Sequence, residues 1–456
     1  MGNKRRQFIK TMSALGISTF LATVFDQKDS ESVTRQTMIE ESDRLIQSSR
    51  MAPLEVRLLD RNGSPIANHM IEIKHVRHLF NFGAAYHTDL SHLHTQKENA
   101  IDLRHREYFL QLFNAATVTF YWRHYETEEN KYADAPLLQR IAWLKQKHFY
   151  LRGHPLFWNH NPACLPTWLE NRELTSPQVR SHMDRVLKHM SAHIFPQLDE
   201  VDVFNELVNW DNYEHPFTDL FKQQGKIAVV KEYLTKFKQL NPTARAVIND
   251  FVPHASYAEM LQEFQNHQVP FEGIGQQAHM FRENWSIERL KTIIERLSVF
   301  GKPIVFTEVS SLSGSTKSSL DFSRTYTDWH SDRFHELQQA DYLEAFYRLA
   351  YSDKRISGVF LWSYSDRDAW LGAPTGILHR DGTPKPAFTR LNRLINETWR
   401  TNVKLKTDNN GYAIVVAAYE GEYKITIGDQ VFTGIHTRTK PLRFSTNETH
   451  YVTDHS

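Results

Sequence analysis

Two glutamates of the chain each close an apolar, β-branched run. Glu206 ends the stretch VDVFNE, and Glu308 ends the stretch PIVFTE. Such runs are typical of buried parallel strands, whose last residues emerge at one edge of a sheet. Two carboxylates held by separate strands of one rigid sheet are the groups that acid-assisted cleavage of a glycosidic bond requires. The intervening chain must therefore bring two strand ends to one place.

Strand-like and helix-like segments alternate from about Leu79 onwards. Eight repeats of this kind predict an α/β fold, a (β/α)8 TIM barrel. A doubly wound open sheet is the alternative, but no glycine-rich phosphate loop opens a helix after an early strand. Helical periodicity is clear in Gln178–His193, Lys226–Leu240 and Ile287–Val299. The expected strands are Phe80–Ala85, Ala115–Trp122, Tyr150–Trp158, Val201–Leu207, Arg245–Asp250, Gly273–His279, Pro303–Val309 and Gly358–Ser363.

The spacing of the two glutamates agrees with this barrel. A barrel of ~250 residues spends roughly 31 residues on each βα unit. Glu206 ends the fourth expected strand and Glu308 the seventh, and their separation in the chain is close to three such units. Both carboxylates are therefore expected at the carboxyl rim, where barrels of this type carry their chemistry.

The length of 456 residues allows flanking parts beside a barrel over residues 79–400. Residues 27–78 are expected to hold a linker and a β-hairpin, because Leu54–Leu59 and His69–Ile73 alternate on either side of the turn DRNGSP. Residues 401–456 contain short alternating runs and are expected to form a small β-rich module. Its tyrosines do not decide whether it binds glycan or braces the barrel.

The first 26 residues have the pattern of an export signal. Lys4-Arg5-Arg6-Gln7-Phe8 precedes a short apolar run, which resembles a twin-arginine signal. An amphipathic helix or a membrane anchor is the alternative. We expect export to the periplasm or the exterior. The single cysteine, Cys164, excludes an internal disulfide and is better interpreted as a small buried residue than as a nucleophile.

The charge balance of the chain is nearly neutral. A formal net charge of +1 indicates no general attraction to nucleic acid, to a membrane surface or to acidic partners. We expect a monomer that makes no membrane contact beyond an uncleaved signal. The 24 histidines show no tight His-x-x-x-His pair with a supporting carboxylate, so neither a metal nor a cofactor is expected.

Polar and aromatic side chains stand at further strand ends. Sugars present a polar edge and an apolar face, so amides, imidazoles and indoles beside carboxylates fit a sugar. A phosphate site would instead want backbone amides and cations. Taken singly, His154 and His279 would be structural histidines, and a lone strand-end glutamate would be a salt-bridge partner. The strand-end candidates are His154, Trp158, Gln277, His279, Trp362 and Trp370.

The motifs RGHPLFWNH, DVFNELVN, GIGQQAH, VFTEVS and LWSYSDRDAW, followed by GILHRDGTPKPAF, resemble glycoside hydrolase family 10 over residues 80–395. Most of this family are endo-β-1,4-xylanases. The resemblance implies that Glu206 is the acid/base and Glu308 the nucleophile of a retaining reaction on xylan, so their pKa values must differ. It also implies sugar contacts from Asn205, His154, Trp158, Gln277, Trp362 and Trp370, and a hydrogen bond from His279 to Glu308.

The second strand departs from the family pattern. The family usually carries Thr-Pro-Glu-Asn-x-x-Lys-Trp there, with Glu, Asn and Lys gripping sugars. Here Thr119 and Phe120 replace the Glu and Asn. Arg123 stands where the Lys does and is expected to bind the substrate in its place. Ser310 also replaces an Asp that often follows the nucleophile. The resemblance therefore leads us to expect a xylan or another β-linked glycan as the substrate. A carbohydrate-binding barrel without turnover is the alternative from another functional class.

Overall fold

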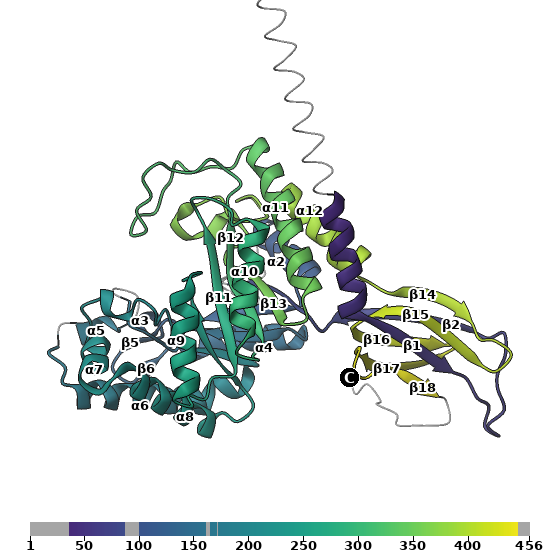
Figure 1. The fold of residues 1–456 in the computed structure, drawn as a ribbon, viewed down its shortest axis with the longest axis horizontal. Helices are drawn as coiled ribbons and strands as arrows, with labels where there is room; N and C mark the ends of the chain where they lie inside the picture. The colour runs from purple at the N-terminus through teal and green to yellow at the C-terminus, as the bar shows by residue number, and fades with distance from the viewer. Residues whose placement is uncertain (1–35, 87–99, 161–164, 171, 446–456) are drawn as a thin grey trace, which may run out of the picture.

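The computed structural model describes residues 36–86, 100–160, 165–170 and 172–445. They form a barrel of strands surrounded by helices and a smaller β-sandwich, which Figure 1 shows side by side. The predicted signal segment and Cys164 lie outside the described residues. Among the helices that the structure describes, none combines the length and the apolar character needed to cross a membrane.

Eight parallel strands close the barrel. Their order is β10-β11-β12-β13-β3-β4-β7-β9, and β9 pairs with β10 to complete the circle. A short ninth strand, β8 (Phe157–Trp158), extends the edge of β9. The predicted (β/α)8 fold is confirmed. The strands are β3 (Asn81–Ala85), β4 (Ala115–Thr119), β7 (Tyr150–His154), β9 (Glu200–Asn205), β10 (Arg245–Asp250), β11 (Gly273–Met280), β12 (Ile304–Ser311) and β13 (Ile356–Leu361).

The two strands that lead to the glutamates are buried along their whole length. Every residue of β9 and of β12 is buried, because helices cover the outer face of the sheet and side chains fill the inner one. Tight packing inside the barrel leaves room only for glycine at certain positions. A Cβ on Gly153 would lie 2.5 Å from the ring of Phe120, and one on Gly83 would lie 2.3 Å from the ring of Phe360.

The surrounding helices follow the apolar periodicity of the sequence. In α10 (Ile287–Ser298) the residues Leu290, Ile293, Ile294 and Leu297 form the buried stripe, and Ser286 caps the first turn. The other helices are α2 (Ala100–Leu112), α3 (Trp122–Tyr125), α4 (Asp134–Gln146), α5 (Thr167–Glu170), α6 (Ser176–His193), α7 (Pro216–Gln224), α8 (Lys226–Leu240), α9 (Ala255–Asn266), α11 (Arg333–Ser352) and α12 (Pro386–Arg393).

Shorter elements complete the barrel. They include one small hairpin, four 3-10 turns and one π-helical turn in the described chain. These elements are β5 (Glu126–Glu128), β6 (Lys131–Tyr132), η2 (Phe195–Gln197), η3 (Trp210–Asn212), η4 (Asp366–Asp368), η5 (Trp370–Gly372) and η6 (Leu394–Thr398).

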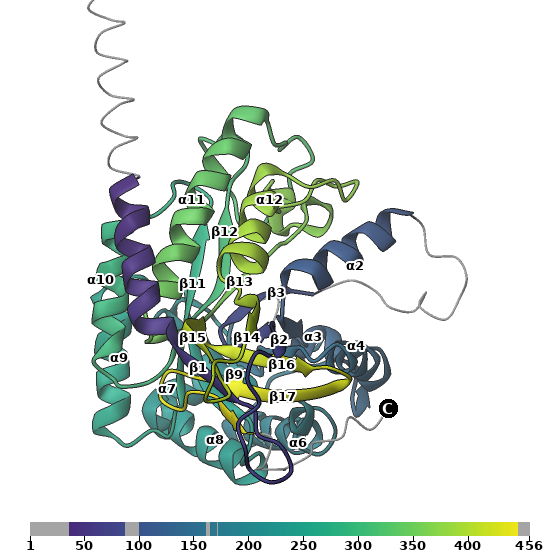
Figure 2. The ribbon, with the colours of Figure 1, turned by 90° about the vertical axis from the view of Figure 1, so that its right-hand side faces the viewer.

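The β-sandwich is built from both ends of the described chain. One sheet has the order β15-β1-β18 and the other β14-β2-β16-β17. Leu54 and Val56 of the first sheet pack against Ile71, Ile73 and Ile425 of the second. Figure 2 shows these strands in front of the barrel. They are β1 (Met51–Arg57), β2 (Met70–His78), β14 (Asn402–Lys406), β15 (Tyr412–Tyr419), β16 (Gly421–Ile427), β17 (Gln430–His436) and β18 (Arg443–Ser445).

The predicted N-terminal β-hairpin is wrong. β1 pairs with β15 and β18, whereas β2 pairs with β14 and β16, so the two strands lie in opposite sheets. A two-stranded ribbon alone cannot bury its apolar face, and the C-terminal strands supply the missing partners. The segment before β1 is helical over residues 36–50 and lies beside α11 (Figure 1). Arg50 ties it there by donating to the carbonyl oxygens of Tyr351 and Ile356.

Candidate active site

Glu206 follows β9 in a backbone conformation that is rare for its residue type. Its φ angle is +59°, in the left-handed region, where a side chain is strained. The turn is fixed to β10 because the Glu206 amide donates to the Asn249 carbonyl at 2.8 Å and the Val208 amide donates to Asp250 Oδ2 at 2.9 Å. Strain of this kind persists where surrounding bonds over-determine the geometry.

The turn directs the Glu206 carboxylate toward three donors. Gln277 Nε2 donates to Oε1 at 3.0 Å, Asn205 Nδ2 donates to Oε1 at 3.2 Å, and Trp158 Nε1 donates to Oε2 at 3.2 Å. These groups come from β11, β9 and β8. Residues of three strands therefore hold one carboxyl group.

Glu308 lies within β12 and is buried. Its Oε1 accepts a hydrogen bond from Asn249 Nδ2 at 2.7 Å, and its Oε2 lies 3.1 Å from His279 Nε2. His154 Nδ1 lies 3.7 Å from Oε1. The hydroxyl of Ser310 lies 3.1 Å from the other ring nitrogen of His279. The imidazole of His279 is thus held between Ser310 and Glu308.

Two amides join the carboxyl groups into one hydrogen-bond network. Asn249 Nδ2 donates to Glu308 Oε1 and also to Asn205 Oδ1, the latter at 2.9 Å. Gln277 Nε2 donates to Asn205 Oδ1 at 3.2 Å and to Glu206 Oε1 at 3.0 Å. Asn205 therefore connects the surroundings of both glutamates. The two strand-end carboxylates that the sequence singled out lie at one site.

The protonation states of the two carboxyl groups are driven apart. Burial, together with the nearby charges of Asp250 and Glu308, raises the pKa of Glu206 to about 8, and the hydrogen bonds from Gln277 and Trp158 offset this only in part. Burial alone would also raise the pKa of Glu308, but His154, His279 and Asn249 lower it to about 2. These shifts favour a protonated Glu206 and an ionised Glu308 at neutral pH.

A buried ionic cluster lies beneath the network. Asp202 accepts from Arg152 Nη2 at 2.5 Å and lies 2.7 Å from His154 Nδ1, and Arg152 Nε donates to Glu200 at 3.1 Å. Burial disfavours the charge on Arg152, but Asp202, Glu200 and Glu308 together raise its pKa. Asp202 thereby fixes the ring of His154.

The same cluster contains a set of groups that could in principle bind a cation. His154, Asp202 and Glu308 offer ligand-type atoms within 4.8 Å of one another. Asp202, however, already accepts from the guanidinium of Arg152, and a cation placed here would face that buried positive charge. The arrangement therefore favours a hydrogen-bond cluster that orients His154 and Glu308.

Aromatic side chains surround the carboxyl groups. The Trp362 ring lies edge-on to His154 and to His279, with centroids 5.3 and 6.0 Å apart. The ring of Trp370 is partly exposed, and its centroid lies 4.9 Å from that of His279. The structure thus places Trp362 beside both histidines and Trp370 beside His279. Arg123 of α3 instead donates to the carbonyl of Leu165 at 3.5 Å, in the segment that follows β8.

The structure brings three further residues to the site that the sequence analysis did not select. Asn249 and Asp202 hold Glu308 and His154, and Tyr121 lies 5.7 Å from the His154 ring. Asn249 stands near the end of the fifth expected strand, so the strand-end rule could have found it. Phe120, by contrast, is buried against Phe195 in the core.

Comparison with known protein families shows which family the chain belongs to. The model of glycosyl hydrolase family 10 matches residues 75–393. The chain belongs to this family. Residues 75–393 include every strand of the barrel and both glutamates.

Individual relatives are distant in sequence. Anti-sigma-I factor RsgI6 of Acetivibrio thermocellus is 23% identical over 402 residues, which are 85% of this chain and 46% of that protein. Endo-1,4-beta-xylanase B of Thermotoga neapolitana is 22% identical over 60% of this chain and 78% of its own length. The crystal structure of xylanase 10B from Thermotoga petrophila, in complex with xylobiose, has a TM-score of 0.58 at 18% identity, covering 70% of this chain and 95% of that one. This structure supports the fold.

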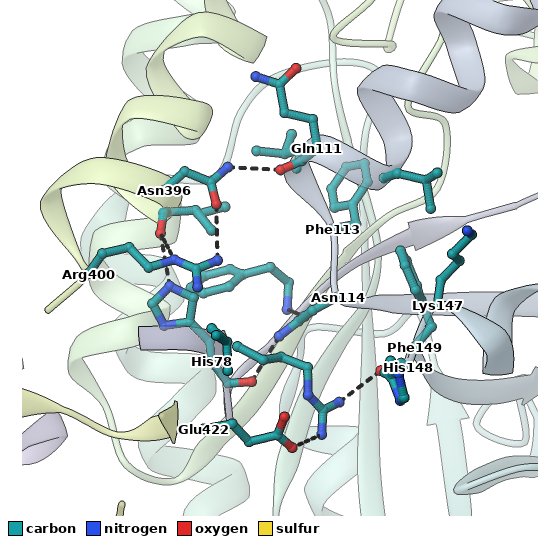
Figure 3. Close-up of a pocket in the computed structure, with 16 residues that line it drawn as sticks. His78, Gln111, Phe113, Asn114, Lys147, His148, Phe149, Asn396, Arg400 and Glu422 are labelled. Atoms are coloured by element: carbon teal, nitrogen blue, oxygen red, sulfur yellow. Dashed lines mark hydrogen bonds and ion pairs between the residues drawn. The ribbon is translucent and has the colours of Figure 1, made fainter. Parts of the chain in front are cut away.

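A cavity of about 490 Å³ lies at the opposite end of the barrel (Figure 3). It is lined by residues at the amino ends of β3, β4 and β7 and by Arg400 and Glu422 near the sandwich. Arg77 donates to Glu422 at 2.5 Å and to the His148 carbonyl at 2.9 Å, and Arg400 donates to the carbonyls of His75 and Ile395. The guanidinium groups that line the cavity therefore connect the barrel to the sandwich.

Proposed function

We propose that this family 10 protein is a retaining glycoside hydrolase that cleaves β-1,4-xylosidic bonds in xylan. The observation that carries the proposal is the buried pair Glu206 and Glu308, joined by one amide network and held with opposite pKa shifts. A glutamate whose role is only a structural salt bridge would not need a protonated carboxyl group beside it. Two carboxyl groups with separated pKa values are what acid-assisted glycoside cleavage uses.

In the first step, Glu206 donates its proton to the oxygen of the leaving sugar while Glu308 attacks the anomeric carbon. The glycosidic bond breaks and an ester forms between Glu308 and the sugar, with inverted configuration. The ester removes the negative charge of Glu308, which removes one of the causes of the high Glu206 pKa. In the second step Glu206 takes a proton from water and the water attacks the anomeric carbon. The ester bond breaks, Glu308 leaves as a carboxylate, and the original configuration returns.

The surrounding residues position these groups in the proposed reaction. Asn205 binds the 2-hydroxyl of the reacting sugar, while Asn249 keeps the Asn205 amide oriented at 2.9 Å. His279 keeps Glu308 ionised and aligned. Trp362 provides an apolar surface beside the histidines for the face of the ring. His154, Trp158, Gln277 and Trp370 line the same sugar position.

A related retaining glycosidase acting on another β-linked glycan is the second candidate. The segment after the second barrel strand favours it, because Phe120 packs into the core and Arg123 of α3 donates to the carbonyl of Leu165. The usual polar contacts to sugar from this segment are therefore changed. A carbohydrate-binding barrel without turnover would have no need for the opposed pKa values of both glutamates. We further propose that the protein is a monomer exported by its twin-arginine-type signal.

Product release from a glycan panel tests the proposal. The protein without its first 26 residues is incubated with plain, arabinose-bearing and glucuronate-bearing xylans, cellulose, mannan and mixed-linkage glucan. Glu308→Ala serves as the inactive variant, and Glu295→Ala, at an exposed glutamate of α10, serves as the matched control. Release of xylo-oligosaccharides by the unaltered protein and by Glu295→Ala, but not by Glu308→Ala, supports the xylanase assignment. Products from another glycan alone overturn the substrate, and glycan binding without any product overturns the enzyme.

A further inference from the structure

The connection from β12 to α11 carries an exposed aromatic ring. Phe322 in this connection is 48% exposed, and Trp370 of η5 beside it is 39% exposed. Their ring centroids are 5.9 Å apart, and both pack against Phe281, at 6.1 and 5.3 Å. Figure 1 shows this connection as a long loop above β12. Two neighbouring aromatic rings are therefore presented to solvent next to the carboxyl rim.

The loop has a core of its own. Tyr326, Trp329, Leu312 and Leu371 are buried together with Phe281. The Tyr326 amide donates to the Leu371 carbonyl at 2.8 Å, and Trp329 Nε1 donates to the Ser315 carbonyl at 2.7 Å. Phe322 is thus attached to a packed base, so little conformational freedom remains to be lost when a ligand covers it.

A close backbone approach fixes the loop against η5. Gly372 has a φ angle of +67°, and a Cβ added there would lie 2.1 Å from the carbonyl oxygen of Tyr326. Lys317 lies over the rings of Tyr326 and Trp329, at 5.0 and 5.7 Å, and pairs with Asp328 at 3.2 Å. The close approach of Gly372 to Tyr326 therefore fixes the loop that carries Phe322 relative to Trp370.

The aromatic pair is continuous with the candidate active site. The Trp370 centroid lies 4.9 Å from that of His279, whose Nε2 lies 3.1 Å from Glu308 Oε2. Phe322 is the next ring outward from Trp370. A glycan chain that places one sugar at Glu308 can therefore extend over this pair, with the apolar faces of its rings on the aromatic surface.

We propose that Phe322, the next ring outward from Trp370, forms an additional sugar subsite that stacks a unit of the glycan chain outside the reacting position. The inference rests on the proposed function and adds a determinant of chain-length preference to it. It also supplies binding surface in addition to that of the altered second strand, whose Thr119 and buried Phe120 provide less polar grip. Stacking on the face of a ring depends little on which hydroxyl groups the sugar carries, so the subsite accepts any β-linked pyranose chain.

Binding to an inactive variant tests the subsite separately from turnover. In the Glu308→Ala background, calorimetry measures the affinity for xylo-oligosaccharides and cello-oligosaccharides of two and of six units. Phe322→Ala is expected to weaken hexasaccharide binding by roughly three- to tenfold and to leave disaccharide binding unchanged. Phe322→Tyr is expected to retain the affinity. Phe334→Ala is the matched control, since this phenylalanine of α11 is 64% exposed and stands elsewhere in the sequence.

The outcomes separate the subsite from the proposed function. Equal losses for both chain lengths, no loss for either, or no binding of any oligosaccharide overturn the subsite. Absence of cleavage by the unaltered protein, with the length-dependent loss still present in the inactive background, overturns the proposed turnover and supports the subsite. Cleavage of xylan without a length-dependent effect of Phe322→Ala supports the enzyme and overturns the subsite.

Discussion

Asn249 donates a hydrogen bond from Nδ2 to Glu308 Oε1 over 2.7 Å. The same nitrogen donates to Asn205, and the Asn249 carbonyl accepts the backbone amide of Glu206. Thr307 in turn donates to Asn249 Oδ1 at 2.7 Å. One asparagine at the end of β10 therefore supports both carboxyl groups, one through its side chain and one through its backbone.

Replacing Asn249 by alanine should impair the anionic carboxylate more than the acid. The backbone contact to Glu206 remains, while Glu308 loses a donor that lowers its pKa. We expect kcat/KM to fall by roughly 10²-fold, in the range for loss of one preorganised donor. The acid limb of the pH profile should move upward from about 2. Asn266→Ala on α9 is the control, and an unchanged acid limb would contradict the assigned role.

The pH dependence of kcat/KM should follow the two carboxyl groups. In the proposed mechanism activity requires Glu308 ionised and Glu206 protonated, so it should rise as the pH passes about 2 and fall as it passes about 8. The measurement is a pH–rate profile on a glycan and on an aryl glycoside whose leaving group needs no proton. The alkaline fall in the glycosylation step should be lost with the aryl substrate. A fall that persists there would assign it to another group.

Glu206→Gln should stabilise the fold at alkaline pH. The pKa of Glu206 is raised from an ordinary value of 4.5 to about 8, so the folded state retains a proton that the unfolded state releases between these values. Stability from this group is full below pH 4.5 and is lost as the pH rises through about 8. Glutamine removes that loss, at most roughly 1.4 kcal/mol per pH unit.

Thermal unfolding of Glu206→Gln and of the unaltered protein from pH 4 to pH 9 measures this difference. The advantage of the variant should be absent at pH 4 and grow toward alkaline pH. Asp250, whose pKa is raised to about 6 by burial, contributes with the same sign in both proteins and cancels in the comparison. A difference that does not vary with pH would contradict the buried-acid explanation.

The sandwich should depend on contacts between the two ends of the chain. Ile425 of β16 is 1% exposed and pairs with Ile73 of β2 and Phe432 of β17, whereas Val416 of β15 is 79% exposed. Ile425→Ser should lower the free energy of unfolding by roughly 2–4 kcal/mol, and Val416→Ser by less than about 0.5 kcal/mol. Denaturant unfolding measures both. Similar costs for the two variants would contradict the two-sheet core.

The barrel and its carboxyl groups could be predicted because their signals are local. The apolar runs that end in Glu206 and Glu308 identify parallel strands, and the repeated alternation with helices predicts a closed barrel. The side of the barrel on which both glutamates lie follows from the common direction of parallel strands. The sequence therefore determined the fold class of this chain and which two carboxyl groups meet.

Other features depend on contacts between residues far apart in the chain. The sequence pattern of β1 predicts one strand of a hairpin, yet β1 pairs with Tyr412–Tyr419. The reason is that a two-stranded ribbon alone cannot bury its apolar face. Asn249 joins both glutamates and Phe322 extends the row of rings from His279, and neither relation has a spacing in the sequence. The opposed pKa values of Glu206 and Glu308 arise from burial and from donors on other strands. Only the tertiary structure decided these, since burial and long-range contacts exist only once the chain is folded.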